Sequence, residues 1–382
     1  MFRGDIMPTI EFVNVTKRFL KDKLIKNLNL VIEDGSYTVL CGPTGSGKTT
    51  ILLMIAGIVK PDKGEIYIDG VLVNDIPPED RNVGIVFETY ALFPHMNVIR
   101  NVTYGPWVRG YDLDLAIKNG REILDMLYLS GWENAYPHEL SGGMKQRVAL
   151  ARAIASNSKI LLLDEPLGAL DAKIRAELRY ELRELVKSLN LTAVHATHDI
   201  EEAMLIADKI VILNNGIVEQ VGTPEEIYEN PKSIFVANYV TEGNFLEGII
   251  KSIENTHYII ELRNGDVLRA NKNTQARYSI NDHVICFIRS EDISIKKMTK
   301  NGNKQLKSNS FEGKIIDISF SGSFTRIEVA IEDWERPIVV RELGDIVDQY
   351  DEKEKVIVHF PDDRFRLYKY PSGKKFADIL LI

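Results

Sequence analysis

The stretch GPTGSGKT, residues 42–49, constrains the fold of this chain more than any other feature of its 382 residues. It matches the pattern G-x-x-x-x-G-K-[ST] and lies between the apolar runs YTVLC and ILLMIA, the strand and helix that a phosphate-binding loop requires. Glycines let the backbone wrap closely around phosphate oxygens, while successive amides and a helix N-terminus supply positive charge. A chance glycine-rich turn is the alternative, but it leaves the flanking elements unexplained. We therefore predict a nucleotide site with the loop residues Gly42, Pro43, Thr44, Gly45, Ser46 and Gly47.

The three residues that follow this loop have predicted roles of their own. Lys48 should bridge the β- and γ-phosphates and so take part in catalysis. Thr49 should place its hydroxyl on Mg²⁺, and Thr50 should reach the α-phosphate. The sequence therefore predicts that the chain binds ATP together with Mg²⁺.

A second element, KILLLDEP at 159–166, is an apolar strand that ends in two carboxylates. Ligands in open α/β sheets bind at such carboxyl ends of strands. We expect Asp164 to hold the Mg²⁺ shell and Glu165 to polarise an attacking water as a general base. Two solvated carboxylates at the end of a strand are the alternative interpretation.

Strand-like and helical patterns alternate from TIEFVNVTKRF to about residue 237, which is typical of an α/β domain with a largely parallel sheet. The clearest strands are YTVLCG, VGIVFE, KILLLDEP, TAVHATHD and KIVILNNG. Residues of about 90–156 have helical patterning with Pro and Gly punctuation, as in a helical insert. We assign residues 8–240 to an α/β P-loop NTPase cassette with a helical subdomain.

After about residue 241 the sequence changes to short β-rich runs separated by Asn, Gly, Asp and Ser, which indicates a small barrel or sandwich. The run NFLEGIIKSI (244–253) is similar to NSFEGKIIDI (309–318). We therefore expect residues 241–382 to form a second domain of two related β modules, at about 241–295 and 309–370.

Composition and charge narrow the function classes. The net charge of −8 argues against a nucleic-acid partner. The longest uncharged runs, such as ILLMIAGIV (51–59), are too short to cross a bilayer, and no secretory signal opens the chain. The two cysteines, Cys41 and Cys286, each lie in an apolar run, which indicates buried thiols in a reducing compartment. We expect a cytoplasmic protein without a membrane span.

The stretch LSGGMKQRVALARAIA (140–155) resembles the signature of the ATP-binding-cassette (ABC) family. With the phosphate loop, LLLDEP, GALD (168–171) and THD (197–199), it has the order and spacing of that family over about residues 8–240. The resemblance implies that Ser141 and the backbone of Gly142 and Gly143 form a second anion-binding helix N-terminus. This end closes over the γ-phosphate of an ATP held by another subunit, so the resemblance implies a dimer around two ATPs, most simply a homodimer.

Three further residues take their roles from the family resemblance. His198 looks like the switch histidine that contacts the γ-phosphate, and both strand alternation and the family spacing favour it over His195. Asp171 resembles the residue that couples the two sites across the dimer. Phe19 resembles the aromatic residue on which adenine stacks, with a core phenylalanine as the alternative.

Glu88, in NVGIVFETYALFPHM (82–96), departs from the family pattern, in which a glutamine stands. In the family that glutamine lends an oxygen to Mg²⁺ and its water, and it links the site to the permease-facing helices. A carboxylate can donate the oxygen but not the N–H donors of an amide. It also adds negative charge beside Asp164. We expect Thr49, Glu88 and Asp164 to hold Mg²⁺ in a working ATPase with altered Mg²⁺ dependence or looser coupling.

The segment VGTPEEIYENPKSIFVANYVTEGNFLEG (221–248) resembles the junction before the C-terminal β domain of importer ATPases of the maltose, polyamine, ferric-iron and oxyanion types. FIRSEDISI (287–295) resembles a further element of that domain, with Ser290 in place of a proline. The resemblance implies an OB-like, TOBE-type regulatory domain and a peripheral location at the cytoplasmic face of the cell membrane.

It also implies integral membrane permease subunits as partners and, indirectly, an extracellular solute-binding protein. The long β tail favours a carbohydrate as the solute. Polyamine, ferric iron and molybdate or tungstate stay open, as does a soluble ABC ATPase that acts outside transport.

Overall fold

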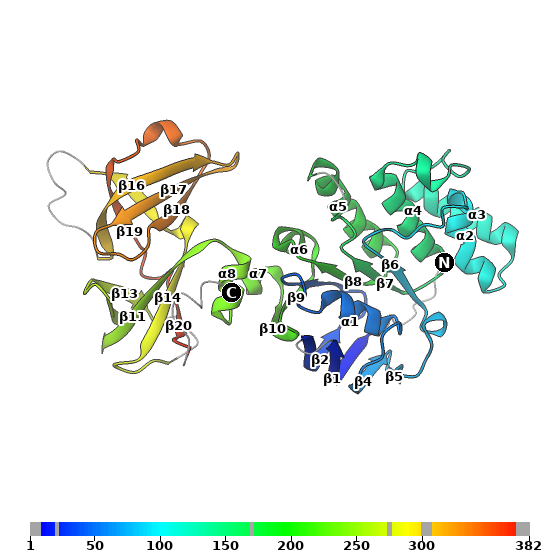
Figure 1. The fold of residues 1–382 in the computed structure, drawn as a ribbon, viewed down its shortest axis with the longest axis horizontal. Helices are drawn as coiled ribbons and strands as arrows, with labels where there is room; N and C mark the ends of the chain where they lie inside the picture. The colour runs from blue at the N-terminus through cyan, green and yellow to red at the C-terminus, as the bar shows by residue number, and fades with distance from the viewer. Residues whose placement is uncertain (1–8, 20–22, 169–171, 273–276, 299–307, 372–382) are drawn as a thin grey trace. The chain divides into compact units, whose positions relative to one another are not determined.

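The structure is a computed structural model that describes residues 9–19, 23–168, 172–272, 277–298 and 308–371 (Figure 1). The chain forms two compact units, Met1–Asn230 and Pro231–Ile382. Helix α8 (Ile234–Val240), which the sequence analysis places before the domain boundary, therefore belongs to the second unit. The hydroxyl of Tyr368 donates a hydrogen bond to the carbonyl of Pro231 at 3.0 Å, which holds the start of this unit to its last strand.

A six-stranded sheet with the order β10-β9-β3-β8-β7-β6 forms the centre of the first unit. All neighbours from β9 to β6 run parallel, and β10 runs antiparallel to β9. Strands β3, β7 and β8 are buried along their whole length, as their continuous apolar runs predict for a parallel sheet. The strands are β3 (Tyr37–Cys41), β6 (Val83–Val86), β7 (Ile160–Asp164), β8 (Thr192–Thr197), β9 (Lys209–Asn214) and β10 (Ile217–Gly222). The carboxyl ends of the parallel strands β9, β3, β8, β7 and β6 meet at one edge, where the candidate site lies.

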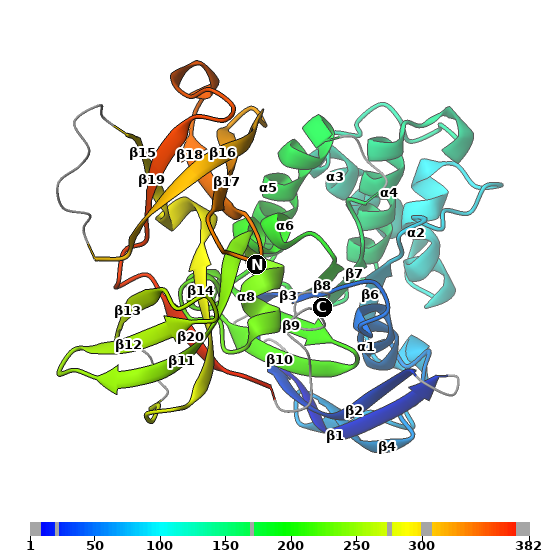
Figure 2. The same ribbon diagram turned by 60° about the vertical axis from the view of Figure 1, so that its left-hand side comes forward.

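A second, antiparallel sheet has the order β2-β1-β4-β5. It consists of β1 (Ile10–Phe19), β2 (Lys23–Ile32), β4 (Lys63–Ile68) and β5 (Val71–Leu72). Helix α1 (Lys48–Ile55) shares one hydrophobic core with both sheets, in which Phe12, Ile51 and Leu162 are almost fully buried. This core fixes the start of α1 at the edge of the six-stranded sheet (Figure 2).

The segment expected as a helical insert contains α2 (Val98–Val108), α3 (Leu113–Met126), the 3₁₀ turn η2 (Pro137–Glu139) and α4 (Gly142–Ala155) (Figure 1). Each of the three α-helices begins with a capping side chain, from Asn97, Asp112 and Ser141 respectively, which accepts a backbone N–H of the first turn. The remaining helices of this unit are η1 (Pro78–Asp80), α5 (Ala172–Ser188), α6 (Ile200–Ile206) and α7 (Pro224–Glu229). Among the described residues, no helix is both long and apolar enough to span a bilayer.

The second unit contains two five-stranded antiparallel sheets around one shared core. The first has the order β13-β12-β11-β14-β20 and consists of β11 (Gly243–Ile253), β12 (His257–Leu262), β13 (Val267–Asn271), β14 (His283–Arg289) and β20 (Arg366–Lys369). The second has the order β15-β19-β16-β17-β18 and consists of β15 (Ser294–Lys297), β16 (Ser310–Phe320), β17 (Phe324–Ile331), β18 (Ile338–Leu343) and β19 (Lys355–His359). Two short 3₁₀ turns, η3 (Ser290–Asp292) and η4 (Val347–Gln349), complete the unit.

Each of the two sheets contains one strand from the other half of the unit. Strand β20, from the second half, pairs with β14 in the first sheet. Strand β15, which follows β14 directly in the chain, pairs with β19 in the second sheet. The β modules are therefore interlocked.

Candidate functional site

The predicted phosphate loop connects β3 to α1. Gly45 and Gly47 have φ values of 85° and 106°, which favour glycine. A Cβ at Gly42 would lie 2.1 Å from the carbonyl oxygen of Leu213, so only glycine fits there. Pro43, Thr44 and Gly45 are exposed. The result is an open backbone turn at the N-terminus of a helix, an arrangement that binds phosphate.

Lys48 lies inside this loop and is only 7% exposed. Its Nζ donates hydrogen bonds to the carbonyl oxygens of Gly42 at 2.7 Å and Pro43 at 3.1 Å. Burial lowers the pKa of Lys48, and the nearby carboxylates of Glu165 and Asp164 act in the opposite direction. The ammonium group is thus held over the loop, at the place where phosphate oxygens would lie.

Thr49 and Asp164 meet beside the loop, although 115 residues separate them in the chain. The Thr49 hydroxyl donates to Oδ1 of Asp164 at 2.9 Å. Burial raises the pKa of Asp164, the bond from Thr49 lowers it, and the charges of Glu165 and Glu88 raise it further. A hydroxyl and a carboxylate are oxygen ligands of the kind that Mg²⁺ prefers. Mg²⁺ in such sites is held by one or two protein side chains together with substrate phosphates, and Thr49 and Asp164 fit that arrangement.

The side chain of Glu165 contacts His198. Its backbone has a φ of 45°, and its N–H donates to the carbonyl of Ala196 at 2.9 Å. Both of its carboxylate oxygens lie 3.0 Å from Nδ1 of His198. The side chain of Glu165 is 18% exposed and that of His198 is 63% exposed. The two adjacent carboxylates therefore have different partners, Thr49 for Asp164 and His198 for Glu165.

Glu88 lies in an exposed turn after β6. Its charge raises the pKa of Asp164, so it acts electrostatically on the same site. The nearby residues Tyr90 and Ala91 have left-handed φ values of 60° and 42°. Arg152 on α4 donates to the carbonyls of both, at 3.2 Å and 2.9 Å, and so fixes this turn to the signature helix. Arg152 could not be predicted as part of this site, because nothing in the run ALARAIA reveals its distant partners.

Ser141 is the N-terminal cap of α4, and its Oγ accepts the backbone N–H of Met144 at 3.3 Å. Ser141 and Gly142 are exposed, and Gly143 is half-buried. Figures 1 and 2 both show α4 apart from α1 within the first unit. Consequently the structure does not bring the Ser141 end to the phosphate loop of the same chain.

The structure describes the remaining expected site residues only in part. Thr50 is half-buried in the first turn of α1. Phe19 ends β1, where its backbone pairs with Lys23, but its side chain lies outside the described residues. Asp171 lies wholly outside them. His195, which the sequence analysis does not favour as the switch histidine, is fully buried in β8.

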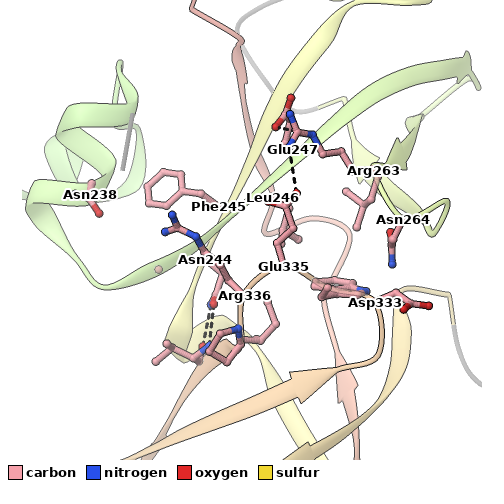
Figure 3. A pocket seen from close by; sticks show the side chains of 16 residues that line it. Asn238, Asn244, Phe245, Leu246, Glu247, Arg263, Asn264, Asp333, Glu335 and Arg336 are labelled. Carbon is pink, nitrogen blue, oxygen red and sulfur yellow. Dashed lines mark hydrogen bonds and ion pairs between the residues drawn. The ribbon is translucent and has the colours of Figure 1, made fainter. Parts of the chain in front are cut away.

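The second unit has a pocket of about 280 Å³ between the start of β11 and the loop before β18 (Figure 3). Nε of Arg263 lies 3.2 Å from the carboxylate of Glu247, and its NH1 lies 3.1 Å from the carboxylate of Glu335. The indole of Trp334 donates to Asp266 at 2.7 Å. Glu247 and Glu335 of this pocket are therefore already engaged with Arg263.

Comparison with known proteins decides the family. The ABC transporter family matches residues 25–168, and the TOBE domain matches residues 286–367. The spermidine/putrescine import ATP-binding protein PotA of Acetivibrio thermocellus is 42% identical over 305 residues, which cover 80% of this chain and 84% of that protein. This chain belongs to the ABC transporter family. PotA of Clostridium acetobutylicum is 39% identical over 329 residues, covering 85% of this chain and 87% of that protein.

Other similar proteins agree with this family. The sulfate/thiosulfate import ATP-binding protein CysA of Synechocystis sp. is 48% identical over 233 residues, which cover 61% of this chain and 66% of that protein. A solved dimeric bacterial ABC transporter cassette is 36% identical, with a TM-score of 0.51, and the match covers 56% of this chain and 98% of that one. A dimeric post-hydrolysis state with ADP and Pi gives the same TM-score and coverage at 35% identity.

These findings confirm the expected fold class, an α/β P-loop NTPase cassette followed by a β-rich TOBE-type domain. They also confirm an ATP hydrolase of the ABC type, with ATP as substrate and Mg²⁺ as cofactor, whose hydrolysis is coupled to transport. The carbohydrate solute expected from the β tail finds no support, since these import proteins are named for polyamines and for sulfate. The length of the β tail is a poor guide, because a subunit that acts through a separate permease need not contact the solute.

Proposed function

We propose that this chain is the ATP-hydrolysing subunit of an importer, in which two copies close around two ATP molecules and drive uptake through separate membrane permease subunits. The observation that carries the proposal is the edge of the six-stranded sheet, where Lys48 and the pair Thr49 and Asp164 lie beside Glu165 and His198. A peripheral position at the cytoplasmic face of the membrane follows from assembly with a permease.

The phosphate loop would hold the nucleotide. Lys48 exchanges its contacts with loop carbonyls for the β- and γ-phosphates, and Thr50 reaches the α-phosphate. Thr49 and Asp164, joined by Glu88, would hold Mg²⁺, which when bound offsets the charge that develops on the phosphates. Binding and orientation are thus assigned to the loop and to the end of β7.

Glu165 would accept the proton of the attacking water, a contribution of roughly 10²- to 10⁴-fold for a well-placed general base. Nδ1 of His198 holds this carboxylate from one side. Because the imidazole is largely exposed, it can contact the γ-phosphate without leaving Glu165. Proton transfer and sensing of the γ-phosphate are then carried by two side chains in direct contact.

The second half of each site would come from the other subunit. The α4 N-terminus at Ser141, Gly142 and Gly143 is exposed or half-buried and separate from its own phosphate loop, so it is open to the ATP of a partner copy. The likeness to a dimeric cassette supports this arrangement. In the same dimer Asp171 would couple the two sites, and Phe19 would stack on adenine.

Exposed apolar side chains on the helical segment support docking to a permease. Large apolar side chains that are exposed to solvent are the kind of surface that a partner covers. Those between residues 98 and 136 that are at least two-fifths exposed are Trp107, Val108, Tyr111, Leu113, Leu115, Met126, Tyr128, Trp132 and Tyr136. Arg152 ties the neighbouring Glu88 turn to α4, and α4 in turn contacts α2 and α3.

A polyamine is the solute best supported. The relatives that match 80% and 85% of the chain, C-terminal residues included, are named for spermidine and putrescine import. The sulfate/thiosulfate relative is more similar, but only over 61% of the chain. Uptake of labelled spermidine, putrescine and sulfate by cells with and without this gene tests the solute, and loss of sulfate uptake alone would overturn it.

The ATPase assignment is tested with purified chain and two substitutions. Glu165→Gln should abolish hydrolysis while leaving MgATP-dependent dimerisation intact, and Ser141→Arg should prevent that dimerisation. The exposed Glu201→Gln serves as a matched control. Hydrolysis by Glu165→Gln at the wild-type rate would refute the general base, and unchanged dimerisation of Ser141→Arg would refute the shared site. Failure to co-purify with any integral membrane protein would favour a soluble ATPase instead.

A further inference from the structure

A buried polar cluster lies behind the turn that carries His198. The cluster consists of Tyr37, His195, Thr197 and Glu202, of which none is more than 4% exposed. Tyr37 begins β3, His195 and Thr197 belong to β8, and Glu202 belongs to α6. The hydrogen bonds described for these side chains run within the cluster and to Asp199, and the roles assigned above leave them unexplained.

Glu202 holds both residues that flank His198. Its Oε2 accepts the hydroxyl of Thr197 at 2.9 Å, and Oγ1 of Thr197 accepts the backbone N–H of Asp199 at 3.1 Å. Asp199 in turn caps α6 by accepting the backbone N–H of Glu202 at 3.1 Å. His198, whose own side chain is largely exposed, is therefore placed through its backbone neighbours.

His195 and Glu202 face each other with polar atoms that have no hydrogen bond of their own. Nε2 of His195 lies 3.6 Å from Oε1 of Glu202, just beyond hydrogen-bond distance, and both atoms are buried. On the other side of the ring, Nδ1 of His195 lies 3.0 Å from the hydroxyl of Tyr37. If α6 moved slightly closer to β8, His195 and Glu202 would form a hydrogen bond. A continuous chain of hydrogen bonds would then run from Tyr37 to Asp199.

The protonation states of the cluster are compatible with this chain. Burial lowers the pKa of His195 to about 3 and raises that of Tyr37, so one ring nitrogen and the hydroxyl carry hydrogens. Burial raises the pKa of Glu202 to about 7; the Thr197 bond and Arg179 oppose this, whereas Asp199 and Glu165 add to it. Either a protonated Glu202 donates to Nε2, or an ionised Glu202 accepts from it while Tyr37 donates to Nδ1.

We propose that Glu202 and Thr197, supported by His195, are positioning residues of the ATPase that set the place of His198 against Glu165. Because both side chains are buried, they would act through His198 and not by contact with the nucleotide. The inference rests on the proposed roles of Glu165 and His198. It adds that helix α6, through the buried side chain of Glu202, holds the residues on either side of His198.

Two matched pairs of substitutions test the inference in the purified full-length chain. Thr197→Val removes the hydroxyl at nearly constant volume, and Thr197→Ser keeps it. Glu202→Leu removes both oxygens, whereas Glu202→Gln keeps an acceptor for Thr197 and a donor for His195. Thr197→Val and Glu202→Leu should lower kcat roughly tenfold to a hundredfold, the scale of a small misplacement of a reacting group. KM for ATP should change less than about twofold, because the phosphate loop is untouched.

Rescue by Thr197→Ser and Glu202→Gln, with kcat restored to within about threefold of wild type, completes the expected pattern. Glu201→Gln is the control on the exposed side of α6. A folded Thr197→Val chain with wild-type kcat, a change in KM in place of kcat, or Glu202→Gln as impaired as Glu202→Leu would each overturn the inference. If Glu202→Leu does not fold, the Thr197 pair decides alone.

Parallel measurements on Glu165→Gln and His198→Ala separate this inference from the proposed function. Loss of activity in these two chains, together with full activity in Thr197→Val, refutes only the positioning role. Full activity in Glu165→Gln refutes the role of Glu165 as general base, on which this inference rests.

Discussion

Replacing Glu202 by glutamine should change how the stability of the first unit depends on pH. Burial raises the pKa of Glu202 from 4.5 to about 7. Between these values the folded chain keeps a proton that the unfolded chain has released, so this carboxyl makes folding less favourable as pH rises through that window. At about 1.4 kcal/mol for each pKa unit, the change amounts to about 3 kcal/mol. The glutamine variant has no proton to release and lacks this contribution.

His195 acts in the opposite sense. Burial lowers its pKa from 6.5 to about 3, so the unfolded chain binds a proton that the folded chain excludes. Stability is therefore lost as pH falls below about 6.5. In the wild type the contributions of His195 and Glu202 offset each other between 4.5 and 6.5. In Glu202→Gln only the loss from His195 remains, and the variant should become steadily less stable on acidification.

Calorimetric unfolding of wild type, Glu202→Gln and Glu201→Gln at several pH values from about 5 to 8 measures this difference. The difference in free energy of unfolding between Glu202→Gln and wild type should change by about 3 kcal/mol across this range. For a unit of this size that corresponds to roughly 6–12 °C in Tm. Groups shared by both chains cancel in the comparison. If the Tm of wild type and that of Glu202→Gln change with pH in the same way, Glu202 does not keep a proton in the folded chain, and the reasoning is refuted.

Three further substitutions have defined outcomes. Glu88→Gln removes a negative charge that acts on Asp164, so the Mg²⁺ dependence of hydrolysis should shift, and superimposable Mg²⁺ titrations would contradict this. Gly42→Ala places a Cβ 2.1 Å from a carbonyl oxygen, so it should destabilise the first unit by roughly 1–3 kcal/mol and abolish ATP binding, as thermal unfolding and nucleotide titration would show. Arg152→Gln removes hydrogen bonds to the carbonyls of Tyr90 and Ala91; amide exchange at residues 88–93 should accelerate, while exchange in β3 stays unchanged.

Local sequence predicts the parts of the site that lie within one loop or at one strand end. The phosphate loop could be predicted directly, because its glycines and Lys48 lie within eight consecutive residues and match one known pattern. Asp164 and Glu165 could be placed because an apolar strand must end at the edge of the sheet. Their different partners, Thr49 and His198, follow from the left-handed backbone conformation at Glu165. The residue types at positions 164 and 165 do not reveal this conformation.

Contacts that depend on register between distant strands could not be predicted. Tyr37 and His195 meet because β3 and β8 are parallel neighbours. The sequence of one strand does not show which strands lie beside it in a parallel sheet. Strand alternation favours His195 as a core residue, but it does not pair this residue with Glu202. Arg152 was missed for the same reason, since its carbonyl partners lie 61 and 62 residues earlier.

The exchange of β15 and β20 between the two sheets of the second unit has a consequence for any attempt to dissect the chain. A fragment cut between the two similar segments would leave one sheet without β20 and the other without β15, and both would expose unpaired strand edges. Chimaeras that swap one β module between relatives would carry mismatched strands for the same reason. The unit from Pro231 onward is therefore the smallest piece of the C-terminal half that can be transplanted whole, and it should be lost or kept in evolution as a single block.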